Sequence, residues 1–97
     1  MIPRLDIDLP EQGTYAYRVT YESETLFEDT GFSSVAHCLV AAVEGLSSEA
    51  VALEVAHGGF VSGTYPLQVI AMNHEQVAGH AVNTTAALME VLGGGGR

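Results

Sequence analysis

Four histidines and one cysteine are the side chains in this chain that could hold a metal ion or act as a nucleophile. His37 and Cys38 are adjacent in a stretch with helical periodicity, so their side chains point about 100° apart. His74 and His80 are six residues apart, which also places them on different faces of a helix. A metal site requires ligands that converge on one point. We therefore predict no metal-binding residues and no bound cofactor.

Cys38 shares an apolar stripe with Val35, Leu39 and Ala42. A cysteine–histidine nucleophile pair would need an exposed thiol beside a histidine. A free cysteine on an apolar helical stripe instead behaves as a small buried hydrophobic residue. We therefore predict that Cys38 is buried and unreactive, that the chain has no catalytic residues, and that it is not an enzyme.

Paired carboxylates and clustered glycines do not form a recognisable site either. Asp6 and Asp8 lie in an N-terminal stretch that is rich in acids and proline. Glu22 and Glu24 lie at a predicted turn, and we interpret both pairs as solvated charge rather than as an acid–base pair. The glycine-rich segment 58–63 lacks the lysine and the following helix that a phosphate-binding loop requires.

The charge balance excludes some partners and favours others. The chain has no lysine and three arginines against twelve carboxylates, a formal net charge of −9. This charge repels phosphate, which argues against direct binding of nucleic acid and of anionic membranes. A protein partner with a basic surface is the positive interpretation. No apolar stretch reaches the ~18 residues of a membrane span, and the first ten residues do not resemble a signal peptide, so we expect a cytoplasmic protein.

Alternating apolar and polar residues predict the first strands. Residues 1–13 are interpreted as an irregular lead-in, residues 14–22 as a strand, and residues 25–30 as its hairpin partner after a turn at Ser23-Glu24. One face of the first strand is formed by Tyr15, Tyr17, Val19 and Tyr21. This face either lies in the core beneath the helices, which we favour, or forms an exposed surface for a protein partner.

Two helices and a second hairpin follow. Residues 34–45 have helical periodicity, with Ser33 or Ser34 as N-cap and Gly45 as a left-handed C-terminal cap. Residues 50–57 alternate as a strand and Gly58-Gly59 is a hairpin turn. A fourth strand is predicted over residues 60–62, over residues 65–72, or over both with a break at Gly63. The last helix is predicted to start at Asn73 and to present one inner apolar stripe formed by Val77, Ala81, Thr84, Leu88, Val91 and Leu92.

These elements predict an α+β fold in the order β-β-α-β-β-α. A four-stranded, mainly antiparallel sheet would carry both helices on one face, as a two-layer sandwich. The single domain would span residues 14–92, and residues 93–97 would form a flexible glycine-rich tail. A second apolar seam on the last helix, which its own sheet would leave uncovered, suggests a homodimer.

Two surfaces are therefore candidates for binding a partner: the second seam of the last helix and the acids of the first hairpin. Their residues are Val82, Met89, Ala78, Ala86, Glu22, Glu24, Glu28 and Asp29. The function we infer is a small, acidic, non-enzymatic interaction module, such as an adaptor, a chaperone or an inhibitor. One specific version is a phage- or plasmid-encoded inhibitor that occupies a basic, nucleic-acid-binding surface. The alternatives are a structural component of a homo-oligomer and, more weakly supported, a small enzyme or ligand-binding domain with its site between subunits.

Overall fold

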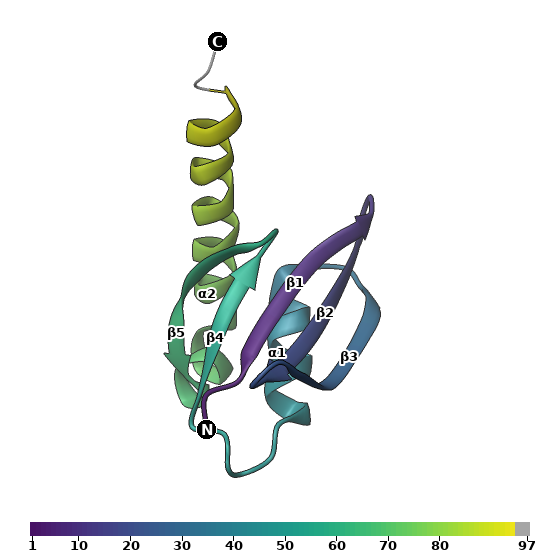
Figure 1. Cartoon of the computed structure of the whole chain (residues 1–97), viewed down its shortest axis with the longest axis vertical. Helices are drawn as coiled ribbons and strands as arrows, with labels where there is room; N and C mark the ends of the chain where they lie inside the picture. The colour runs from purple at the N-terminus through teal and green to yellow at the C-terminus, as the bar shows by residue number, and fades with distance from the viewer. Residues whose placement is uncertain (95–97) are drawn as a thin grey trace.

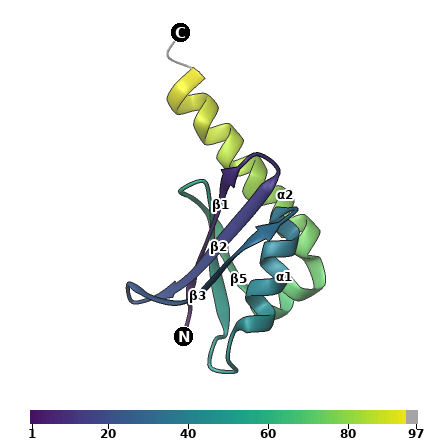
Figure 2. The same cartoon turned by 90° about the vertical axis from the view of Figure 1, so that its right-hand side faces the viewer.

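The computed structural model describes residues 1–94, and for Gly93 and Gly94 it describes the backbone alone. The elements follow in the order β1 (Arg4–Glu11), β2 (Thr14–Tyr21), β3 (Glu24–Phe32), α1 (Val35–Gly45), β4 (Ala52–His57), β5 (Phe60–Pro66), α2 (Leu67–Met89) and a π-helical turn, η1 (Glu90–Gly94) (Figure 1). The strands form one mixed sheet in the order β3-β2-β1-β4-β5. Both helices lie against the same face of that sheet (Figure 2), so the α+β class is confirmed. Residues 95–97, most of the predicted tail, lie outside the described residues.

The predicted number of strands was wrong because the N-terminal segment is not an irregular lead-in. It forms β1, the central strand of a five-stranded sheet, antiparallel to β2 and parallel to β4. Leu5 and Ile7 are fully buried, whereas Asp6 and Asp8, which alternate with them, face away from the core. This alternation is a strand signal. The acids and prolines around it led to the wrong interpretation.

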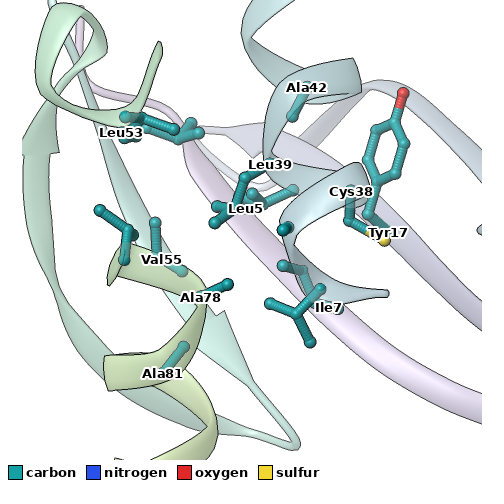
Figure 3. Packing of buried hydrophobic residues seen from close by; sticks show 14 of the residues in the cluster. Leu5, Ile7, Tyr17, Cys38, Leu39, Ala42, Leu53, Val55, Ala78 and Ala81 are labelled. Carbon is teal, nitrogen blue, oxygen red and sulfur yellow. The ribbon is translucent and has the colours of Figure 1, made fainter. Parts of the chain in front are cut away.

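The core lies between this sheet and the two helices (Figure 3). From the strands it receives the fully buried Leu5, Ile7, Val19, Leu53 and Val55, and from the helices Cys38, Leu39, Ala42, Ile70 and Ala81. Tyr17 is also buried and its ring packs against Phe27 and Phe32, with centroids 6.1 and 5.4 Å away. The core interpretation of the tyrosine face is thus confirmed for Tyr17 and Val19.

Local signals fix the backbone geometry at the start of α1 and at the turns of the β2–β3 and β4–β5 hairpins. Ser34 is the N-cap of α1, and its hydroxyl accepts a hydrogen bond from the backbone N–H of His37. Gly58 and Gly59 both have positive φ, as a tight hairpin requires. The β2–β3 hairpin instead turns at Glu22 and Ser23, with φ of 53° and 69°, one residue earlier than predicted.

Gly45 has a different role from the predicted one. It is the last residue of α1 and is not left-handed. A Cβ atom at this position would lie 2.9 Å from the ring of Phe27. The missing side chain therefore allows the helix to approach β3 closely, rather than allowing the backbone to reverse.

The start of α2 was also predicted wrongly. The helix begins at Leu67, directly after Pro66 ends β5, and its first turn places Ile70 in the core. Asn73 has non-helical backbone angles, φ of −133° and ψ of 35°, and marks a kink between a first helical segment, which the sequence did not predict, and a second that starts where it was predicted. The apolar residues before Asn73 can be buried by either a strand or a helix, so periodicity alone did not separate these possibilities.

Candidate interaction surfaces

The sheet face that the helices leave uncovered carries most of its charge in cross-strand rows. Arg18 of β2 is in register with Asp6 of β1 on one side and Glu28 of β3 on the other. Arg4 of β1 is in register with Glu54 of β4. Because Leu5 and Ile7 face the core, the residues that alternate with them must lie on this open face. Strand register thus brings together acids from segments far apart in the sequence.

Both arginines on this face are held by carboxylates. Arg4 Nε donates to Asp6 Oδ1 at 3.0 Å and to Oδ2 at 3.1 Å, and its Nη1 lies 3.7 Å from Glu54 Oε1. Arg18 Nε lies 2.7 Å from Glu28 Oε2. The Arg18–Glu28 pair is exposed and the Arg4 contacts are partly exposed, so these pairs contribute little to stability. Their main effect is that positive charge on this face is already neutralised.

An open hollow of about 610 Å³ lies on the same face. Three carboxylates and one arginine of the open face supply the charge of its lining: Asp6, Asp8, Glu28 and Arg18. Asp29 also lines the hollow, but it is in register with the core residue Tyr17, so its side chain extends from the helix side of the sheet. The excess of negative charge in a concave surface favours a cationic group over an anionic one. The hollow is therefore suited chemically to a basic side chain.

The predicted acids divide into two groups in the structure. Glu28 and Asp29 line the hollow. Glu22 and Glu24 are exposed at the β2–β3 turn, about 13 Å along the strand from Glu28. The sequence interpretation missed Asp6 and Asp8 as members of this surface. The alternation of Leu5 and Ile7 with acids could have placed them there.

Only part of the predicted second seam of α2 lies at the surface. Ala78 is 7% exposed and packs in the core, so including it in a partner surface was wrong. Val82 is 40% and Met89 59% exposed, and Ala86 is exposed as well. Ala78 is covered because α1 and α2 pack side by side, which the helical pattern of α2 alone does not reveal.

The predicted inner stripe of α2 also ends early. Val77 and Ala81 are buried, but the side chains of Leu88, Val91 and Leu92 are exposed. The reason is visible in Figure 1, where α2 runs past the end of the sheet. Thr85 is the last buried residue of α2.

A hydrogen-bonded contact fixes α2 to the β4–β5 hairpin just before the helix leaves the sheet. His57 Nδ1 lies 2.9 Å from Thr85 Oγ1, which is also within donating distance of the carbonyl oxygens of His57 and Ala81. A hydroxyl carries one hydrogen, so Nδ1–H donates to Oγ1 while the hydroxyl donates to a carbonyl. Burial lowers the pKa of His57, and the charge of Asp8 opposes this shift. The contact stabilises the packing of α2 on the sheet.

The remaining candidate residues for chemistry are not assembled into a site. Cys38 is fully buried, as predicted, and burial raises the pKa of its thiol to about 11, which keeps it protonated. His37 is exposed and contacts the hydroxyl of Ser33 at 2.8 Å. Within residues 1–94 no three histidine, cysteine or acidic side chains are placed to share a metal ion. The unreactivity of Cys38 and the absence of a metal site stay predictions.

Two further findings bear on the kind of protein this is. In the described part of the chain, no helix is both long enough and apolar enough to cross a membrane. Comparison of the chain with protein-family models, with curated proteins and with solved structures gave no significant match. The open sheet face and the exposed face of α2 are therefore the two features of the molecule that indicate a function.

Proposed function

We propose that this chain is a cytoplasmic, non-enzymatic protein-interaction module whose open sheet face binds a basic surface of a protein partner. The observation that carries the proposal is the hollow lined by Asp6, Asp8 and Glu28, on a face whose arginines are already paired. Arginine or lysine side chains of a partner would form charge-assisted hydrogen bonds with these solvated carboxylates. The same charge disfavours nucleic acids and anionic membranes as direct partners.

One specific version of this proposal is an inhibitor of bacterial, phage or plasmid origin. The acidic sheet face would bind the basic surface by which a target protein holds phosphate groups. Binding there would compete with binding of nucleic acid. This version is supported by the net charge of −9 in a chain of 97 residues. It adds one expectation, that binding of this chain and binding of DNA to the same target exclude each other.

The proposal is tested with a defined basic probe, an oligo-arginine peptide labelled with a fluorophore. The variant Asp8→Asn/Glu28→Gln removes two negative charges from the open face at the hollow. The control Glu44→Gln/Glu49→Gln removes the same charge elsewhere on the surface. Because each lost ion pair with the probe is solvent-exposed, we expect the hollow variant to weaken binding by about fivefold more than the control.

The salt dependence and the control decide whether the site is specific. Binding to the hollow should weaken as ionic strength increases, because the pairs are screened. Equal weakening by the hollow variant and its control would show that only net charge attracts the peptide, and would contradict a binding face on the sheet.

A further inference from the structure

One face of α2 carries both a projecting side chain and an empty groove. At intervals of three and four residues it presents Gly79, Val82, Ala86 and Met89. The N-terminal half of this face, with Gly79 and Val82, borders a groove of about 340 Å³ between α1 and α2. The C-terminal half lies where the helix has passed the end of the sheet, and there Met89 is exposed (Figure 1).

Gly79 has no explanation within its own chain. Glycine in the middle of a helix is destabilising relative to alanine. Its φ is not positive, and a Cβ atom at this position would meet nothing within 4 Å. Gly45, by contrast, is required because Phe27 occupies the space of its Cβ atom. The space at Gly79 is therefore open to a side chain from outside the chain.

We infer that the outside group is Met89 of a second copy, and that two copies pair through antiparallel α2 helices. With the two-fold axis near Thr84, Met89 of one copy lies opposite Gly79 of the other, and Val82 lies opposite Ala86. Large residues thus face small ones, which is the condition for close helix packing. A two-fold interface must be self-complementary, and this face contains both the projection and the groove that receives it.

The distribution of charge selects a second copy over other partners. Residues 76–89 contain no aspartate, glutamate, lysine or arginine, although the chain as a whole has a net charge of −9. Two copies of so acidic a protein repel each other wherever their carboxylates meet. The α2 face carries acids only at its two ends, Glu75 beside the groove and Glu90 after Met89, whereas most acids lie on the open sheet face or the β2–β3 hairpin.

The pairing is tested first by a cross-link that only the antiparallel dimer permits. Residues 79 and 89 of one helix are about 15 Å apart, too far for a disulfide within one chain. Mild oxidation of Gly79→Cys/Met89→Cys should therefore give covalent dimers on a non-reducing gel. Gly79→Cys and Met89→Cys alone should give none, and Cys38 does not interfere because it is fully buried.

Sedimentation of the chain at micromolar concentration supplies the second test. We expect a dimer whose dissociation constant rises at least about tenfold in Met89→Glu, because an ionised carboxylate loses its hydration in the apolar interface. Gly79→Leu should weaken the dimer similarly by filling the groove. The control is Met72→Glu, which adds the same charge at a methionine that is 74% exposed near the other end of α2, and it should leave the dimer unchanged.

Three outcomes would overturn the inference. They are a monomeric wild-type chain, equal effects of Met89→Glu and Met72→Glu, and no cross-link in the double cysteine variant. Circular dichroism of each variant separates loss of pairing from loss of folding. Gly79→Leu is the most informative variant in that respect, because leucine favours the helix more than glycine does.

Discussion

The two helices follow similar hairpins and cover the same face of the sheet, yet they end in different surroundings. α1 has 11 residues and buries five of them, and it ends at Gly45, where Phe27 of β3 still lies against it. α2 has 23 residues and is buried only as far as Thr85. The difference shows that helical periodicity and coverage by a sheet are separate properties. A helix can continue its apolar pattern after its own domain has stopped supplying a surface for it.

We expect the largest difference in stability between substitutions of a buried leucine in α1 and an exposed leucine in η1, the turn that continues α2. Leu39→Ala in α1 should lower the free energy of unfolding by about 2–5 kcal/mol, because it leaves a cavity in a core where Leu39 is fully buried. Leu92→Ala, at a position that is 70% exposed, should change it by less than about 0.5 kcal/mol. Urea unfolding followed by circular dichroism measures both. A cost above about 2 kcal/mol for Leu92→Ala would show that Leu92 of η1, the turn that continues α2, is covered rather than exposed.

Glycine substitutions sharpen the comparison with a smaller effect. Gly45→Ala should destabilise the fold by about 1–3 kcal/mol, because the new methyl group meets the ring of Phe27. Gly79→Ala should stabilise it by up to about 1 kcal/mol, because the position is helical and open. Both are compared by thermal unfolding in the Met89→Glu background, so that self-association does not contribute. The same sign for both substitutions would contradict the contrast.

The smallest predicted effect concerns the place where α2 leaves the sheet. Burial lowers the pKa of His57 below its ordinary value of 6.5, so the fold favours the neutral imidazole. The unfolded chain therefore binds this proton more readily, and stability should be complete above about pH 6.5 and decrease as the pH falls below it. Asp8, Tyr15 and Thr85 are the groups that face His57, and only Asp8 opposes the shift.

Unfolding between pH 5 and pH 8 measures this effect by difference. The His57→Gln variant should lose part of the pH dependence of the wild-type chain. The control His80→Gln, at an exposed histidine of α2, should retain it. Identical profiles for the wild-type chain and His57→Gln would show that the burial of His57 does not couple to folding.

Where the sequence signals were local, they predicted the structure well. Ser34 caps α1, Gly58-Gly59 forms a hairpin, and the strand 14–22 corresponds closely to β2. The errors occurred where a local signal had two interpretations. The acids and prolines around Leu5 and Ile7 concealed a central strand, and Asn73 resembles an N-cap although it lies inside α2.

The candidate surfaces were predictable to a lesser degree. Glu28 and Asp29 were identified from the sequence, but their neighbours in the hollow come from β1, which pairs with β2 rather than with β3. No spacing in the sequence reveals this neighbourhood, because strand register creates it. Ala78 was assigned to an exposed seam, and only the packing of α1 against α2 removes it from that surface.

By itself, the sequence determined the charge, the β2–β3 and β4–β5 turns to within one residue, and the apolar periodicity of each helix. These properties depend on neighbouring residues and on side-chain type, which the chain carries directly. The tertiary structure decided which strand is central, which acids share a hollow, and where along α2 the core ends. Those outcomes depend on contacts between distant segments, above all the parallel pairing of β1 with β4, and a local pattern contains no information about them.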